Sequence, residues 1–219
     1  MYNKSDTEYI GRNNILAMKG RENMVLFNNI KLSEEQKLFV TKALEGKNIL
    51  VDACIGSGKT TAIQQLCNVF PSDKKILYLT YNKLLKLDAK SKIHKKNVLV
   101  TNYHGFAYMS LLRAGKKVGI SDLIQVFNNE IKTVGKYDLL IIDEYQDIEQ
   151  ELSQLLEIIK SSNPQMQIIA VGDMEQKIYD KTTLDVSAFI KVFLDDFERL
   201  EFTRCFRLSE ELASMLGRV

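Results

Sequence analysis

The sequence predicts one α/β domain in which helices cover both faces of a parallel sheet. Six short apolar runs recur along the chain, and helix-length segments lie between them. Continuous apolar runs are typical of strands buried on both faces, and strands that alternate with helices build a parallel sheet. A chain of 219 residues is long enough for one sizeable core and cramped for two complete domains.

The elements follow one another regularly after residue 31. Residues 1–31 contain six asparagines and two glycines without sustained periodicity, so we expect an irregular N-terminal extension there. A helix is expected over residues 33–45, because Ser33 and Gln36 have the spacing of a capping box. Further helices are expected over residues 60–70 and 148–160, each followed closely by a proline. The expected strands are residues 48–53, 75–81, 97–102, 137–143, 167–173 and 199–204.

The run ACIGSGKT, residues 53–60, lies between the first expected strand and a helix. A glycine-rich turn in this place can point backbone N–H groups at phosphate oxygens, and Gly56 and Gly58 lack the Cβ atoms that would obstruct the approach. Lys59 would reach the β- and γ-phosphates, and the Thr60 hydroxyl would ligate Mg²⁺. A chance glycine-rich turn is the alternative, expected in about one chain of this length in fifty. The predicted nucleoside triphosphate site comprises Ala53, Cys54, Ile55, Gly56, Ser57, Gly58, Lys59, Thr60 and Thr61.

Acidic residues follow the fourth apolar run, where residues 143–147 read DEYQD. The carboxyl edge of a parallel sheet is where ligands bind. Asp143 would hold Mg²⁺, mostly through water, and Glu144 would act as the general base that polarises the attacking water. The alternative is a helix start with Asp147 as its N-cap, and both interpretations can hold together.

The runs ACIGSGKT, DEYQD and VGDMEQKIY (residues 171–179) resemble, in this order, the motifs of the UvrD/Rep/PcrA-like superfamily 1 DNA helicases. These are DNA-translocating ATPases built from paired RecA-like motor domains. The general phosphate-loop pattern begins with Gly, whereas this family normally has Ala, as at Ala53 here. The resemblance spans residues 32–219 and implies a P-loop NTPase (RecA-like) fold, ATP and Mg²⁺ as cofactors, and an N-terminal motor domain.

The resemblance also implies roles outside the phosphate loop. Gln36 matches a glutamine that reads the adenine edge, with the capping box as the alternative. Phe206 matches an aromatic residue that stacks on adenine, with core packing as the alternative. Gln176 matches the glutamine that senses the γ-phosphate, and Arg207 matches an arginine that contacts it. The implied catalytic residues are Lys59, Glu144, Gln176 and Arg207.

Single-stranded DNA is the partner that the resemblance implies, with RNA as the alternative. The matching positions are Tyr81, Asn82, Lys83, Tyr103, His104 and Tyr179. Stacked bases on such rings are worth about 1–3 kcal/mol each, although aromatic residues at strand ends often only pack. The lysines between residues 83 and 96 could track phosphates or form a solvated helix face. The net charge of +2 gives no independent case for a nucleic-acid partner.

The chain departs from the family pattern in three places. Residues 180–182 read DKT where the family usually has Arg-Trp-Arg, and only a minimal insertion fits near residues 108–136. The sequence given stops at Val219, before a second motor domain. That domain, or a partner protein, would supply an arginine finger worth a factor of about 10³–10⁵, so we expect little ATPase activity from this chain alone. The alternative functions are a non-catalytic ATP- or DNA-binding module that regulates a partner, and another P-loop enzyme such as a nucleotide kinase.

Three scattered cysteines, Cys54, Cys67 and Cys205, form no CxxC pair and favour a reduced setting without a zinc site. No stretch approaches the ~20 apolar residues of a membrane span, and the N-terminus lacks the apolar core of a signal peptide. We therefore expect a cytoplasmic protein with no membrane partner.

Overall fold

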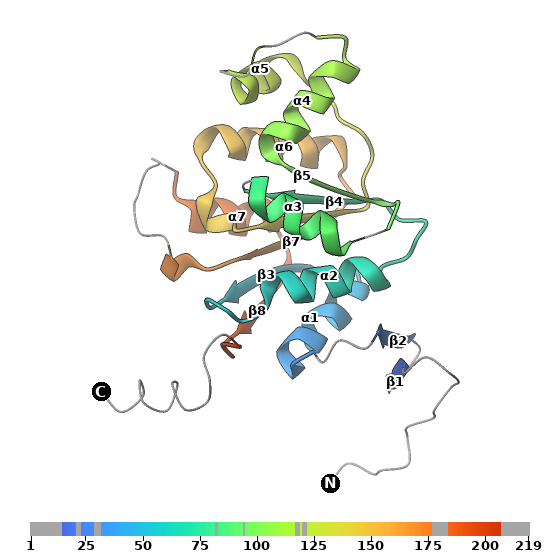
Figure 1. Ribbon diagram of the computed structural model, residues 1–219. Coiled ribbons are helices and arrows are strands. Elements are labelled where there is room, and N and C mark those ends of the chain that lie inside the picture. Colours follow the sequence, from blue (N-terminus) through green and yellow to red (C-terminus); the bar gives the residue numbers. More distant parts are fainter. Residues whose placement is uncertain are drawn as a thin grey trace.

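The computed structural model describes residues 15–20, 23–28, 32–81, 83–93, 95–116, 119, 122–176 and 184–206 (Figure 1). Within these residues, six parallel strands form one sheet in the order β5-β4-β6-β7-β3-β8. The predicted α/β class, with a parallel sheet between helices, is therefore confirmed. The strands are β3 (Asn48–Ala53), β4 (Ile76–Thr80), β5 (Val98–Asn102), β6 (Leu139–Asp143), β7 (Gln167–Gly172) and β8 (Phe197–Phe202).

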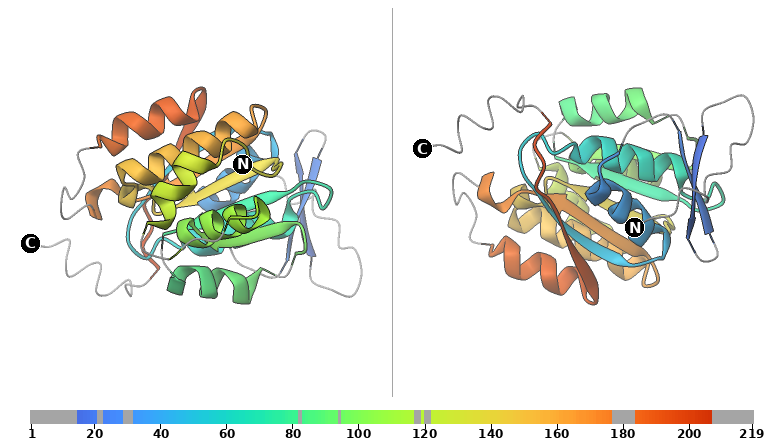
Figure 2. Two further views of the ribbon diagram at one scale, coloured as in Figure 1. Left: turned by 90° about the horizontal axis from the view of Figure 1, so that it is seen from above. Right: turned by 90° about the horizontal axis from the view of Figure 1, so that it is seen from below.

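Helices cover both faces of this sheet (Figure 2). Alternate residues of β3 face the two layers: Ile49 and Val51 pack in one apolar cluster, and Leu50 packs in the other. The first cluster includes residues of α1 (Glu34–Leu44), α2 (Lys59–Val69) and α3 (Lys83–Lys92). The second includes residues of α4 (Tyr103–Arg113), α5 (Leu123–Glu130), α6 (Gln150–Ser162) and α7 (Val186–Leu194).

The start of α1 confirms the predicted capping box. Gln36 N donates to Ser33 Oγ at 3.2 Å, and Ser33 N donates to Gln36 Oε1 at 3.0 Å. Helix α2 begins at Lys59, within the ACIGSGKT run, and its C-cap residue is Phe70. The expected boundaries of both helices are thus correct to within one residue.

Helix α6 begins later than the sequence indicates. A 3₁₀ helix, η1 (Tyr145–Asp147), follows β6, and α6 starts at Gln150 with Glu149 as its N-cap residue. The expectation that Asp147 caps this helix is therefore wrong, because η1 takes up residues 145–147 before the α-helix begins. Between α4 and β6, the described residues contain α5, which packs against α4 and α6.

The expectation of irregular structure is wrong for residues 15–20 and 23–28. Strands β1 (Ile15–Gly20) and β2 (Asn23–Asn28) form a two-stranded antiparallel sheet in which Gly20 pairs with Asn23 (Figure 1). Gly20 and Asn23, two of the residues that suggested a loop, form the last pair at one end of the two strands. No helix in the described part of the chain is long and apolar enough to cross a bilayer.

Candidate functional site

The phosphate loop lies between the end of β3 and the start of α2, at the carboxyl edge of the sheet. Gly56 and Gly58 have φ angles of +75° and +78°, a left-handed conformation that favours glycine. A Cβ atom on Gly58 would lie 2.5 Å from Gln36 Nε2, so this glycine is also required for packing. The Ser57 hydroxyl is buried and has no hydrogen-bond partner among the described residues. A loop with an unused buried donor and two glycine turns fits a phosphate group.

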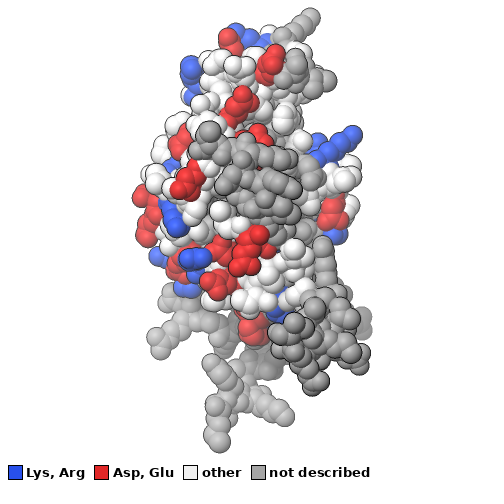
Figure 3. All heavy atoms as spheres, turned by 90° about the vertical axis from the view of Figure 1, so that its left-hand side faces the viewer, with Lys and Arg blue, Asp and Glu red and all other residues white. Residues whose placement is uncertain are grey.

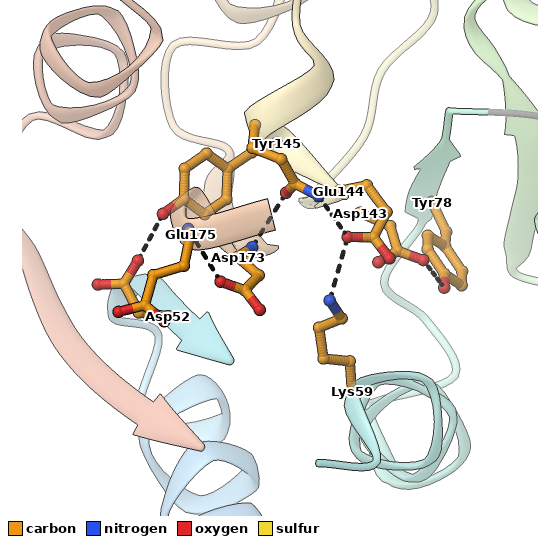
Figure 4. Close-up of polar contacts among 9 residues, drawn as sticks. Asp52, Lys59, Tyr78, Asp143, Glu144, Tyr145, Asp173 and Glu175 are labelled. Carbon is orange, nitrogen blue, oxygen red and sulfur yellow. Dashed lines mark hydrogen bonds and ion pairs between the residues drawn. The ribbon is translucent and has the colours of Figure 1, made fainter. Parts of the chain in front are cut away.

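Lys59 and Glu144 meet across this edge (Figure 4). Lys59 Nζ lies 3.1 Å from Glu144 Oε2, and the two side chains are 12% and 20% exposed. Glu144 has a φ of +54°, an unfavourable conformation for a residue with a Cβ atom. The cation predicted to bind phosphate and the predicted general base thus come together in a largely desolvated place.

Asp143 ends β6 next to this pair. It is 3% exposed, and the Tyr78 hydroxyl donates to Asp143 Oδ2 at 2.8 Å. Burial, followed by the charge of Glu144, raises the pKa of Asp143 to about 6. A divalent cation at this carboxylate would favour its charged form.

The donor set fits Mg²⁺ bound together with phosphates. No group of three or more His, Cys, Asp and Glu side chains that could hold a metal ion occurs among the described residues. Mg²⁺ commonly uses one or two protein ligands and completes its shell with water and substrate phosphates. Asp143 and the hydroxyl of Thr60, in the first turn of α2, are donors of this kind.

Gln146 links Glu144 to the end of β7, a role that the sequence analysis did not assign. Its Nε2 donates to Glu144 Oε2 at 2.8 Å, and its Oε1 accepts from Asp173 N at 3.0 Å. Asp173 Oδ1 in turn accepts from Glu175 N at 3.0 Å. The only sequence signal for this link is the glutamine two residues after the proposed base.

Gln36 is already fully engaged. Its Nε2 donates to Ser57 O at 3.0 Å and to Gly58 O at 3.3 Å, while its Oε1 completes the capping box. The structure therefore confirms the alternative, in which Gln36 is part of a capping box. The same side-chain amide also supports the phosphate loop. Reading an adenine edge would require this buried amide to exchange partners.

Phe206 lies over the phosphate loop. Its backbone N donates to Gly56 O at 2.8 Å, its ring is 48% exposed, and the Arg204 guanidinium lies 5.3 Å from the ring centre. The alternative of core packing is wrong for this exposed ring. Arg207 lies outside the described residues, as does the side chain of Gln176, whose backbone belongs to η2 (Met174–Gln176).

The expected nucleic-acid positions differ in exposure. Tyr81 is 37% exposed at the end of β4, and Lys83 and His104 are exposed. Tyr103 is 2% exposed and packs in the cluster of α4 to α7, so the expectation that it stacks on bases is wrong. Tyr103 is the first residue of α4, which Asn102 caps by accepting from Gly105 N. Asn82 and Tyr179 lie outside the described residues.

The lysine-rich stretch belongs mostly to α3, of which only Ala89 is buried among the ten helix residues. Lys92 Nζ pairs with Asp88 Oδ2 at 2.8 Å, and Lys95 Nζ donates to Phe70 O at 2.7 Å. The stretch thus forms a solvated helix face in which two lysines have partners within the protein, and its contact with phosphates stays a prediction.

The fold and the phosphate loop define a P-loop nucleotide-binding α/β domain. Residues 36–182 match the model of the AAA_19 family, whose description is "AAA domain". Because this match covers more than half of the chain, the protein belongs to this family.

Two curated relatives are both named as helicases. The F-box DNA helicase protein 1 of Schizosaccharomyces pombe is 39% identical over 82 residues, which are 37% of this chain and 9% of the relative. The exonuclease/helicase subunit RexA of Lactococcus lactis is 24% identical over 233 aligned residues, covering 92% of this chain and 19% of the relative. The chain therefore spans less than a fifth of the length of either protein.

Solved helicase structures share the fold. Pif1 helicase from Candida albicans has a TM-score of 0.55 at 19% identity, covering 86% of this chain and 44% of that chain. Pif1 from Bacteroides, in complex with ADP-AlF3 and ssDNA, has a TM-score of 0.55 at 17% identity, covering 87% and 46%. These neighbours confirm the P-loop, RecA-like fold. With the family match and the named relatives, they confirm the resemblance to a superfamily 1 DNA helicase motor domain.

Proposed function

We propose that this chain is the ATP-binding and ATP-hydrolysing motor domain of a DNA helicase or translocase, with little ATPase activity alone. The observation that carries the proposal is the 3.1 Å contact of Lys59 with Glu144 beside the buried Asp143. It gathers a cation for phosphate, a carboxylate for water and a carboxylate for Mg²⁺ at one sheet edge.

The phosphate loop, residues 53–61, would bind the triphosphate through its backbone N–H groups. Thr60 and Asp143 would hold Mg²⁺, which supplies positive charge to the phosphate oxygens. Lys59 would turn from Glu144 to the β- and γ-phosphates, leaving Glu144 to accept a proton from the attacking water. Gln146, which donates to the same carboxylate oxygen, would keep Glu144 oriented during this exchange.

Four further roles belong to the proposal. Phe206 would stack on the adenine, which its exposed ring and its backbone contact with Gly56 support. Gln36 would contact the adenine edge, Gln176 would sense the γ-phosphate, and Arg207 would contact it. A second motor domain or a partner protein would supply the arginine finger.

Single-stranded DNA is the proposed partner, with RNA as the alternative. The Bacteroides Pif1 structure contains ssDNA, and its fold is similar to this one. Tyr81, Lys83 and His104 are exposed and available for contact, and Asn82 and Tyr179 complete the proposed set. We also propose a cytoplasmic location without a membrane partner, which the free thiols of all three cysteines support.

A non-catalytic, ATP-binding regulatory module is the second candidate. The observation that favours it is that Lys59 and Gln146 both contact Oε2 of Glu144, which engages one of the two carboxylate oxygens within the protein. This candidate predicts nucleotide binding without turnover.

Single-turnover hydrolysis of ATP, with protein in excess and with or without single-stranded DNA, distinguishes the two candidates. We expect slow hydrolysis by the chain and a further loss of about 10²-fold or more in Glu144→Gln, with the affinity for Mg·ATP retained. Glu151→Gln removes the charge of an exposed carboxylate on α6 and is the matched control. Equal rates in Glu144→Gln and the wild type would exclude Glu144 as the base, and binding without any turnover would favour the regulatory module.

A further inference from the structure

Three side chains form a second polar connection at the same sheet edge, on the face opposite α2. The Tyr145 hydroxyl donates to Asp52 Oδ1 at 2.5 Å, and Arg199 contacts Asp52 Oδ2 through Nε at 2.8 Å and Nη2 at 2.7 Å. We call Tyr145, Asp52 and Arg199 the Asp52 bridge. Figure 4 shows Tyr145 and Asp52 turned toward each other, apart from the pair formed by Lys59 and Glu144.

The inner half of the Asp52 bridge is shielded from water. Tyr145 is 1% exposed and the Asp52 side chain 24%, whereas the Arg199 side chain is 61% exposed. The Tyr145 ring also packs so closely on Gly172 that a Cβ atom there would lie 2.6 Å from its Cδ1. Because exposed ion pairs are weakened by solvent, the Tyr145 to Asp52 hydrogen bond is the stronger contact, and Arg199 mainly orients the carboxylate.

Each member of the Asp52 bridge lies next to a part of the ATP site. Tyr145 directly follows Glu144, whose left-handed conformation has to be held by its surroundings. Asp52 directly precedes Ala53, the first residue of the phosphate loop. Arg199 lies on β8, and the carbonyl of Phe202 on this strand accepts from Cys54 N at 3.0 Å. The three contacts thus fasten the base, the phosphate loop and the segment leading to Phe206.

We propose that Tyr145 and Asp52 are positioning residues that fix Glu144 relative to the phosphate loop during the attack on the γ-phosphate. This inference rests on the proposed function of the site. The bridge acts on geometry, not on nucleotide affinity, because none of its members belongs to the phosphate loop itself. A shift of the base of the order of 1 Å is enough to slow an attack substantially.

Gln146 provides a second tether for Glu144, from the side of β7. Removing the Tyr145 hydroxyl therefore loosens the base without releasing it. Tyr145→Phe keeps the ring that packs on Gly172, so the fold is retained and the hydrogen bond alone is lost. Asp52→Asn weakens the same contact from the other side.

The test compares the affinities of the chain for Mg·ADP and for Mg·ADP with aluminium fluoride, which mimics the γ-phosphoryl group in transfer. For Tyr145→Phe we expect the affinity gain from aluminium fluoride to fall about tenfold, with the Mg·ADP affinity changed less than twofold. Asp52→Asn should reduce this affinity gain to a similar extent, and the double variant should reduce it little further than either single variant. Tyr137→Phe removes a half-buried hydroxyl that bonds to Arg113 and is the matched control, with no change expected.

Three results would overturn the inference. In the first, aluminium fluoride raises the affinity of Tyr145→Phe as much as that of the wild type, while Glu144→Gln loses this increase. The proposed function would then stand, but the Asp52 bridge would have no part in it. A parallel loss of Mg·ADP affinity and thermal stability would assign the bridge to the fold alone. A wild-type chain that binds both complexes equally would also overturn the inference, because there would be no aluminium fluoride gain for the bridge to support.

Discussion

Replacing Gly58 by Ala tests how the phosphate loop is held. Gly58 has a φ of +78°, and an added Cβ would lie 2.5 Å from Gln36 Nε2. The left-handed conformation costs a non-glycine residue about 1–2 kcal/mol. Displacing the Gln36 amide from Ser57 O and Gly58 O leaves a buried donor unpaired, which costs about 1–3 kcal/mol more. We therefore expect Gly58→Ala to lower the free energy of unfolding by about 2–5 kcal/mol.

Gly46→Ala is the matched control. Gly46 has a φ of +81°, but nothing lies within 4 Å of its added Cβ, so this variant carries only the backbone cost. Urea unfolding of the purified chain measures both variants, and their difference isolates the displacement of Gln36. In a Gln36→Ala background the added Cβ has room, so the cost of Gly58→Ala should fall to that of Gly46→Ala. Equal destabilisation by the two alanines in the otherwise unchanged chain would refute the proposed packing of Gln36 on the loop.

Two further predictions concern charge and nucleic acid. The pKa of Asp143 is raised to about 6 from 3.8, so the folded state binds more protons than the unfolded state between these values, and stability should rise as the pH falls from about 6 to 4. Asp143→Asn should remove this pH dependence of the free energy of unfolding, measured in urea, and should stabilise the chain at pH 7 by up to about 3 kcal/mol. The same variant should lose the Mg²⁺-dependent part of the ATP affinity. An unchanged pH dependence would contradict the raised pKa of Asp143. Tyr81→Ala should weaken binding of single-stranded DNA by about 1–3 kcal/mol in fluorescence anisotropy without a change in unfolding. Tyr103→Ala should instead destabilise the fold by about 3–5 kcal/mol, and the opposite pattern would reverse the roles of these two tyrosines.

Local pattern predicted the sheet well because strands buried on both faces carry a strong apolar signal. NILVDA and QIIAVG became β3 and β7 with nearly the expected ends. Strand β8 is shifted by two residues from the expected run, because an edge strand such as FERLEF mixes exposed and buried residues and has no continuous apolar run. The pairing of β1 with β2 was missed because Gly20 and Asn23, which form its last pair, are residue types typical of loops.

Side-chain roles were harder to predict where one residue has several available partners. The spacing of Ser33 and Gln36 predicted the cap, but nothing local reveals that the same amide reaches the phosphate loop 21 residues later. Aromatic character alone could not separate the buried Tyr103 from the exposed Tyr81, because burial depends on which elements pack around each ring. Asp52 shows the same limit: its two partners lie 93 and 147 residues away in the sequence.

The contact between Lys59 and Glu144 has a consequence for how the proposed reaction would begin. Lys59 holds the carboxylate at 3.1 Å, and the γ-phosphate would compete for the same ammonium group. When a phosphate takes Lys59, Glu144 would lose its cation partner and become free to accept a proton, while Gln146 and, as proposed, the neighbouring Tyr145 would still fix its position. Glu144 would thus be released from Lys59 when the γ-phosphate that the water attacks is bound. Without a bound phosphate Lys59 stays paired with Glu144, so the ion pair would make the proposed general base conditional on the nucleotide.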